Sequence, residues 1–91
     1  MQEKLADKRS LYRTLGNIGL VYYCDSIYSK SIDYHLKSLK LIDENDKRGL
    51  ANTLNNIGMS YAGKREYTKA LDYFFKSLDI SRAIEYNKYI A

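Results

Sequence analysis

One stretch of this chain occurs twice, and that repetition limits the possible folds more than any other feature. Residues 7–39 align without a gap with residues 46–78, and 17 of the 33 aligned positions are identical. The two copies are therefore 39 residues apart. A repeat at a fixed period of this order is typical of a solenoid, in which each unit buries its apolar face against the next unit. The sequence predicts two stacked copies of one small structural unit.

Each copy has the residue spacing of two amphipathic helices. In the first copy, apolar residues recur three or four positions apart through residues 11–22 and again through residues 32–39. The second copy repeats both patterns at residues 50–61 and 71–78. Such spacing places the apolar side chains along one face of a helix. Each copy is thus predicted to be a helical hairpin, and the fold class is all-α.

Short polar segments mark the predicted ends of these helices. The residue pairs at 25–26 and 63–64 interrupt the apolar pattern and are expected to form the turns within the hairpins. Asp7 and Asp46 occupy the same position in the two copies. An aspartate at the start of a helix accepts hydrogen bonds from free backbone amides of the first turn. We therefore expect both aspartates to cap the first helix of their copy.

Two glycines recur at the same position in the first helix of each copy. These residues, Gly19 and Gly58, lie within the apolar stripe rather than at a helix end. A glycine inside a helix costs about 1 kcal/mol relative to alanine, so its repetition suggests a steric requirement. Because glycine lacks a Cβ atom, it allows the second helix of the hairpin to approach closely. The two glycines are expected to mark the contact between the helices.

The hairpin resembles the tetratricopeptide repeat, whose pattern combines leucine, glycine and tyrosine on the first helix with small and aromatic residues on the second. The matching residues are Leu15, Ile18, Gly19, Tyr22, Tyr28, Ser31, His35 and Ser38 in the first copy, and Leu54, Ile57, Gly58, Tyr61, Tyr67, Ala70, Phe74 and Ser77 in the second. Packing of the repeats is assigned to Leu15, Ile18, Gly19, Tyr22, Leu54, Ile57, Gly58, Tyr61, Ala70 and Phe74. The resemblance implies a right-handed superhelical stack of antiparallel hairpins.

The period of 39 residues is longer than the usual period of this family, which is about 34 residues. The additional residues fall near 42–46 and 82–86, where they are expected to lengthen the second helix of each copy by about one turn. The alignment assigns residues 7–45 to repeat 1 and residues 46–84 to repeat 2. Residues 1–6 would be the tail of a preceding repeat helix, and residues 85–91 the start of a following repeat. The chain is therefore interpreted as a fragment of a larger array.

The sequence offers little material for catalysis. His35 and Cys24 are the only histidine and the only cysteine, and one of each makes neither a metal site nor a disulfide. His35 aligns with Phe74, so we interpret it as a packing residue of aromatic size. No glycine-rich loop that could bind a phosphate is present in the sequence. We predict that the chain is not an enzyme and requires neither a cofactor nor a metal.

Charge and hydropathy narrow the class of partner. The chain has 15 basic and 11 acidic residues, a net charge of +4, and the two signs are interspersed. Nucleic-acid-binding proteins usually concentrate positive charge on one element, so a nucleic acid is not the expected partner. No apolar run approaches the ~20 residues that span a bilayer, so we expect no membrane partner. The default compartment is the cytoplasm.

The resemblance also implies a binding surface. In arrays of this family, the first helices of the repeats line a concave groove that holds an extended peptide or a partner helix. By this resemblance, the groove residues here are Arg13, Asn17, Leu20, Tyr23, Asn52, Asn55, Asn56 and Met59. A side-chain amide has both a donor and an acceptor, so Asn17 and Asn56 could pair with the backbone of a bound chain. The alternative is that these asparagines are solvated surface residues.

These observations favour a protein–protein or peptide interaction module within a larger signalling or regulatory protein. Two alternatives remain open at this point. The chain could be a structural spacer or a self-association element whose uncapped repeat ends pair with each other. It could also be the sensory part of a regulator whose effector lies outside this chain.

Overall fold

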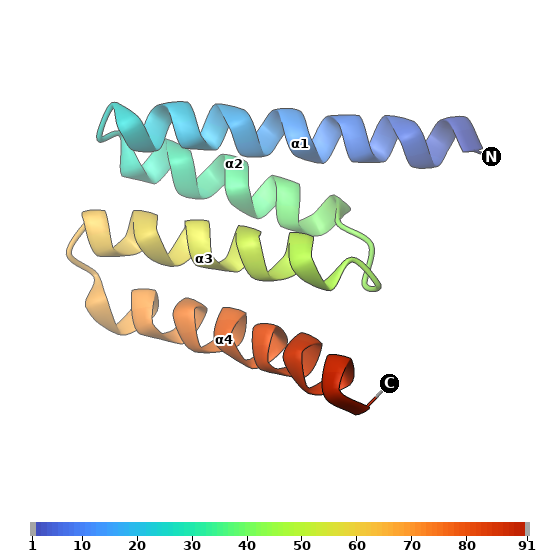
Figure 1. Ribbon diagram of the computed structural model, residues 1–91. Coiled ribbons are helices and arrows are strands. Elements are labelled where there is room, and N and C mark those ends of the chain that lie inside the picture. Colours follow the sequence, from blue (N-terminus) through green and yellow to red (C-terminus); the bar gives the residue numbers. More distant parts are fainter. Residues whose placement is uncertain (1, 91) are drawn as a thin grey trace.

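The computed structural model describes the backbone of residues 2–90 and the side chains of residues 7–85. Within this part, four helices follow one another in a row, each antiparallel to the one before it (Figure 1). They are α1 (Gln2–Cys24), α2 (Tyr28–Leu41), α3 (Lys47–Gly63) and α4 (Tyr67–Ile90). The main packing contacts join α1 to α2, α2 to α3 and α3 to α4. The predicted all-α stack of helical hairpins is confirmed.

The start of α3 agrees with the sequence pattern, whereas the start of α1 does not. The Asp46 carboxylate accepts a hydrogen bond from the backbone N–H of Gly49 at 3.0 Å, so Asp46 caps α3 as predicted. Asp7, by contrast, lies inside α1, and its predicted role as a cap is wrong. The reason is that residues 2–6 contain only residues that continue a helix, with no proline or glycine to end it. Their assignment to a preceding repeat stays a prediction.

The two hairpin turns have the same backbone conformation. Ser26 and Arg65, which are equivalent residues of the two repeats, both have a positive φ, of 64° and 66°. In each turn the next backbone N–H returns to a carbonyl of the preceding helix, from Ile27 to Tyr22 at 2.8 Å and from Glu66 to Tyr61 at 2.9 Å. These bonds satisfy carbonyl groups that the helix end would otherwise leave free.

The segment that joins the two repeats departs from the prediction. Residues 42–46 form a loop after α2 ends at Leu41, and they do not lengthen the helix. Within this loop the Asp43 carboxylate accepts from the backbone N–H of Asn45 at 2.9 Å, a local bond that competes with helix formation. In the second repeat, the equivalent residues 81–85 contain no such pair, and α4 continues through them to residue 90. The assignment of residues 85–91 to a following repeat stays a prediction.

Small side chains fill much of the space between the helices. Ser38 donates to the backbone carbonyl of Tyr12 at 2.8 Å, and the equivalent Ser77 donates to the carbonyl of Ala51 at 2.8 Å. These bonds tie the second helix of each hairpin to the backbone of the first. A buried hydroxyl requires a partner of this kind to offset its loss of water. Among the buried apolar residues, Ile57 is fully enclosed in the core.

Both repeated glycines lie where two helices approach closely. A Cβ atom built on Gly19 would lie 2.8 Å from Nε2 of His35, and one on Gly58 would lie 2.7 Å from Cε1 of Phe74. Distances this short are not found for real Cβ atoms, so a larger residue would require the facing ring or the helix that carries it to shift. The burial of the residues that we assigned to repeat packing is uneven. Five of them are buried, namely Gly19, Leu54, Ile57, Gly58 and Ala70, and five are half-buried, namely Leu15, Ile18, Tyr22, Tyr61 and Phe74.

Each hairpin also carries a pair of stacked tyrosines on its surface. Tyr22 stacks on Tyr34 with ring centroids 5.5 Å apart, and the equivalent Tyr61 stacks on Tyr73 at 5.6 Å. A lysine ammonium group lies over each of the four rings, at 5.0–5.5 Å from the centroid. The attraction between a cation and an aromatic face therefore holds the lysines at positions 30, 37, 69 and 76. The first helix of each hairpin is joined in this way to the second.

Candidate binding groove

A cavity opens between the first helices of the two repeats, because α1 and α3 touch each other only slightly. It has a volume of about 460 Å³. It is lined by Tyr12, Arg13, Gly16, Asn17 and Leu20 of α1, by His35 and Ser38 of α2, and by Asp46, Gly49, Asn52, Thr53 and Asn56 at and after the start of α3. We call this cavity the groove. Its two walls are α1 and α3, and α2 supplies part of its floor.

The groove brings together some of the residues that the sequence assigned to a binding surface. Those that line it are Arg13, Asn17, Leu20, Asn52 and Asn56. Three others do not line it. Tyr23 packs edge-on against Tyr28 at 5.6 Å, and the exposed Asn55 amide lies 3.5 Å from the sulfur of Met59 on its own helix. The structure thus places five of the eight predicted residues in the lining of the groove and the other three outside it.

Side-chain amides face the groove from both walls. Asn17 comes from α1, whereas Asn52 and Asn56 come from α3. Among the described residues, none of these three amide groups forms a hydrogen bond with another side chain or with the backbone. Each amide therefore has a donor and an acceptor available to a ligand. The groove therefore offers hydrogen-bonding groups from both of its walls.

The floor of the groove is buried and uncharged. His35 is only 1% exposed, and its Nε2 atom has no hydrogen-bond partner among the described residues. Burial lowers the pKa of His35 below the ordinary value of 6.5, so the imidazole is neutral at neutral pH. Ser38 is also buried and uses its hydroxyl for the carbonyl of Tyr12. A ligand would therefore meet charge only at the edge of the groove.

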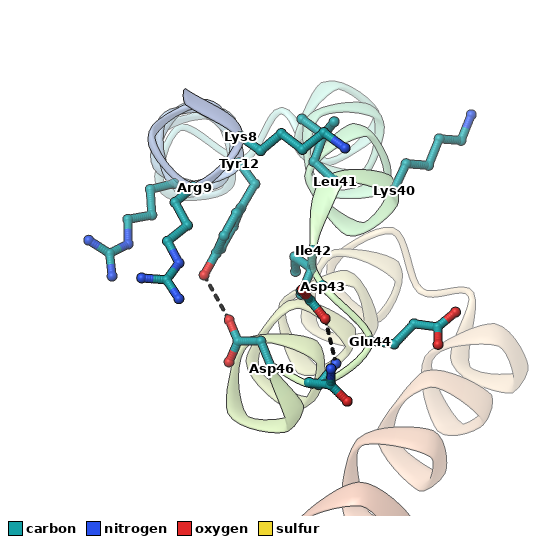
Figure 2. Close-up of a pocket in the computed structure, with 11 residues that line it drawn as sticks. Lys8, Arg9, Tyr12, Lys40, Leu41, Ile42, Asp43, Glu44 and Asp46 are labelled. Carbon is teal, nitrogen blue, oxygen red and sulfur yellow. Dashed lines mark hydrogen bonds between the residues drawn. The ribbon is translucent and has the colours of Figure 1, made fainter. Parts of the chain in front are cut away.

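A second cavity adjoins the groove at the amino-terminal end of α1, with a volume of about 720 Å³ (Figure 2). We call it the loop cavity, because the loop between α2 and α3 forms one of its sides. Its lining residues are Lys8, Arg9, Tyr12, Arg13, Lys40, Leu41, Ile42, Asp43, Glu44, Asn45 and Asp46. Tyr12, Arg13 and Asp46 also line the groove, so the two cavities adjoin at these residues.

A hydrogen bond between the two repeats lies where these cavities adjoin. The Tyr12 hydroxyl donates to the Asp46 carboxylate at 2.8 Å (Figure 2). Asp46 has a lowered pKa because the Gly49 N–H and then the Tyr12 hydroxyl bind its charged form. The same bond to Asp46 raises the pKa of Tyr12. Both residues therefore keep the protonation state that the bond requires across the neutral range.

Sequence reasoning identified Asp46 only as a helix cap and missed its bond to Tyr12. The second repeat has Ala51 in place of Tyr12, so this position cannot provide the same link there. That break in the repeat pattern was the one available signal, since a tyrosine without a counterpart is free to make a specific contact. The partner is 34 residues away and became visible only in the folded chain.

The described residues contain no cluster of side chains that could bind a metal ion. No group of three or more histidine, cysteine, aspartate or glutamate residues among them could hold a metal ion. Cys24 is exposed, whereas His35 is buried, so these two residues do not share an environment. In the same part of the chain, no helix is long and apolar enough to cross a membrane. The chemistry that the groove offers is hydrogen bonding and charge pairing.

Comparison with known proteins agrees with this architecture. Residues 10–83 match a family model described as tetratricopeptide repeat, and the match includes both helical hairpins. Comparisons with curated proteins and with solved structures gave no match. The family match extends over far more than half of the chain, and it coincides with the repeated hairpins and their paired glycines. The chain belongs to the tetratricopeptide repeat family.

Proposed function

We propose that this chain is a protein-interaction module that binds a peptide segment in the groove between α1 and α3. Membership of the tetratricopeptide repeat family supports the general role of a protein-interaction scaffold. The observation that carries the specific proposal is the convergence of the amides of Asn17, Asn52 and Asn56 on one cavity. Their hydrogen-bonding groups are not used within the described part of the chain.

An extended peptide matches this arrangement because its backbone presents alternating N–H and C=O groups. A side-chain amide can donate to the carbonyl and accept from the N–H of the same bound backbone. Asn17 and Asn56 lie on opposite walls, so together they would hold a chain from both sides. Leu20, which lines the groove and is 41% exposed, offers an apolar contact beside them. We therefore expect the ligand to be a segment with mixed polar and apolar side chains.

Replacing both Asn17 and Asn56 by alanine is expected to weaken partner binding by roughly thirtyfold, because each lost amide removes about 1 kcal/mol of hydrogen bonding. The test starts with affinity capture from a lysate of the source cells, in which wild-type and variant chains are compared. Peptides that cover the captured partner are then titrated against both chains. Far-UV circular dichroism should show that the variant is as helical as the wild type.

Asn55→Ala is the matched control for this experiment. Asn55 is an exposed asparagine on α3 that does not line the groove, so its replacement should leave binding unchanged. A partner that binds the double variant and the wild type equally well would contradict the proposal. A partner that is lost with Asn55→Ala would place the binding surface on another face of α3.

The outer face of α4 supports a second candidate function, self-association with another copy of the chain. Its exposed apolar residues follow helical spacing, and they are Tyr67, Leu71, Phe75 and Leu78. Tyr67 and Phe75 are 60% and 59% exposed. The equivalent residues of α2 are covered, at least in part, by α3, and Ile32 is only 5% exposed. A second copy could cover the stripe on α4 in the same way, because contiguous exposed apolar surface favours association.

Sedimentation velocity over a range of protein concentrations tests this second candidate. We expect the wild-type chain to form dimers as its concentration rises, and the variant Leu71→Lys/Phe75→Lys to remain monomeric. Charged residues on the stripe would have to lose water in the interface, which is unfavourable. The groove variant Asn17→Ala/Asn56→Ala should associate like the wild type. A wild-type chain that stays monomeric at high concentration would exclude this function.

A further inference from the structure

Three cations of α1 have no ion-pair partner among the residues whose side chains the structure describes, and all three line the loop cavity. They are Lys8, Arg9 and Arg13, and each is exposed. The ion pairs of the described residues lie elsewhere, between Glu66 and the ammonium groups of Lys64 and Lys69. Lysines also lie over tyrosine rings, at positions 30, 37, 69 and 76. The cations of the cavity are thus available, whereas those of the tyrosine-bearing surface are engaged.

Among the described residues, the acidic side chains of the same cavity form no ion pair with these cations, although Asp46 lies close enough to feel the charge of Arg9 and Arg13. Asp46 accepts from the Tyr12 hydroxyl and from the Gly49 N–H, and Asp43 accepts from the N–H of Asn45. In Figure 2, Glu44 extends from the loop on the side away from α1. The cavity is therefore polarised, with a cationic wall on α1 and an acidic wall on the loop. A ligand with negative charge would be attracted to the first wall and repelled by the second.

The cationic wall lies directly beside the groove. Arg9 and Arg13 are four residues apart, so they lie on the same face of α1, and Arg13 lines both cavities. Figure 2 shows Lys8 extending toward the end of α2. Both arginines are close enough to Asp46 for their charge to lower its pKa. A peptide that lies between Asn17 and Asn56 would reach this wall by continuing toward the start of α1.

We propose that the peptide bound in the groove carries an acidic segment, whose carboxylates pair with Lys8, Arg9 and Arg13 while the adjoining backbone pairs with the groove amides. This inference rests on the proposed function, which it deepens by naming the charge of the ligand and its direction. Arginine is suited to this role because its planar guanidinium group binds a carboxylate through two parallel hydrogen bonds. The acidic residues would lie at the end of the ligand nearest the start of α1.

Two features favour an acidic peptide over a nucleic acid. A phosphodiester backbone carries negative charge at every nucleotide, and the chain would bring some of that charge against Asp43 and Glu44 on the opposite wall. A peptide can place its carboxylates on one side and at a few residues only. The groove next to the cations presents amides to a backbone of N–H and C=O groups, which a nucleic acid lacks.

An array of short synthetic peptides of random sequence and equal length tests this inference with the complete chain. The wild type should select peptides enriched in aspartate and glutamate at one end, and added salt should weaken their binding. The variant Arg9→Gln/Arg13→Gln should bind the selected peptides about tenfold more weakly and lose the acidic preference. Glutamine keeps much of the aliphatic stem of arginine, so the loss would report on charge. Arg9→Lys/Arg13→Lys should retain the preference, although with lower affinity.

Arg65→Gln/Arg82→Gln is the matched control, because it removes the same amount of charge from exposed residues that line neither cavity. Selection of peptides without an acidic bias, sensitive to Asn17→Ala/Asn56→Ala, would overturn the inference and leave the proposed function standing. Selection of no peptide at all would overturn both. A single-stranded RNA oligonucleotide that binds as tightly as the best peptide, and depends on Arg9 and Arg13, would overturn the choice of an acidic peptide.

Discussion

Replacing Gly58 by alanine is expected to lower the free energy of unfolding by about 2 kcal/mol, although alanine is the better helix former. The new Cβ would lie 2.7 Å from the Phe74 ring and 3.2 Å from the backbone carbonyl of Ala70. Overpacking costs ~1–3 kcal/mol, and we expect the upper end of that range here because the backbone carbonyl cannot move without shifting α4. Alanine recovers at most about 1 kcal/mol through helix propensity. Urea denaturation followed by circular dichroism measures the difference.

Gly16→Ala provides the comparison that isolates the steric effect. Gly16 also lies inside a helix, α1 rather than α3, but a Cβ there would meet only the Ser38 hydroxyl, at the ordinary contact distance of 3.9 Å. This variant should therefore be more stable than the wild type by up to about 1 kcal/mol. The two variants should differ by roughly 3 kcal/mol, which corresponds to more than 10 °C in melting temperature for a domain of this size. Equal stability of the two variants would contradict the close approach at Gly58.

Replacing His35 by phenylalanine is expected to raise the free energy of unfolding by about 1–2 kcal/mol. His35 is 1% exposed and its Nε2 atom has no partner among the described residues, and an unpaired buried polar atom costs about that much. The second repeat shows that a phenylalanine ring fits this place, because Phe74 packs against Gly58 as His35 packs against Gly19. Urea denaturation at pH 7.5 compares the two chains. At this pH the histidine is largely neutral in both the folded and the unfolded state, because its unperturbed pKa is ~6.5.

The same substitution is expected to remove a pH dependence. Burial lowers the pKa of His35 in the folded chain below 6.5, so the unfolded chain binds a proton more readily as the pH falls. The wild type should therefore have its full stability above pH 6.5 and lose stability progressively as the pH falls from there toward the lower folded-state pKa. His35→Phe should be flat over this range, apart from the contribution of acidic residues at lower pH. Unfolding curves recorded at a series of pH values test this.

Phe74→His is the reciprocal control. It places a histidine against Gly58 in the second repeat, and it should both destabilise the chain and add to the loss of stability below pH 6.5. A destabilised His35→Phe chain would show that Nε2 makes a favourable contact in solution. An unchanged pH profile in that variant would assign the dependence to a group other than His35.

The sequence by itself determined the architecture, and the physical reason is that helix patterns and repeats are local. A stripe of apolar residues three or four positions apart depends only on neighbours within one or two turns of helix, so it can be read without coordinates. Repetition at a constant spacing then shows that the same hairpin occurs twice. The cap at Asp46 also follows from a local rule, because its partner Gly49 is only three residues away.

The repeat pattern did not predict the ends of the helices correctly, because neighbouring residues decide where each helix begins and ends. Residues 42–46 form a loop because the Asp43 carboxylate binds the Asn45 N–H, whereas α4 continues through the equivalent positions. Asp7 has the same position in its repeat as Asp46, but it follows residues that are themselves helical. In both cases identical alignment positions differ in structure because their neighbours differ. A repeat alignment averages over such differences and therefore misplaced these boundaries.

Only the tertiary structure decided which side chains meet at the groove. Asn17, Asn52 and Asn56 converge there, while Asn55 points outside, although all four are asparagines on the first helices of their repeats. The Tyr12–Asp46 bond and the cationic wall beside it join residues from different repeats. Such contacts depend on how one hairpin is rotated against the next, and that angle results from the packing of every buried residue between them rather than from any local pattern.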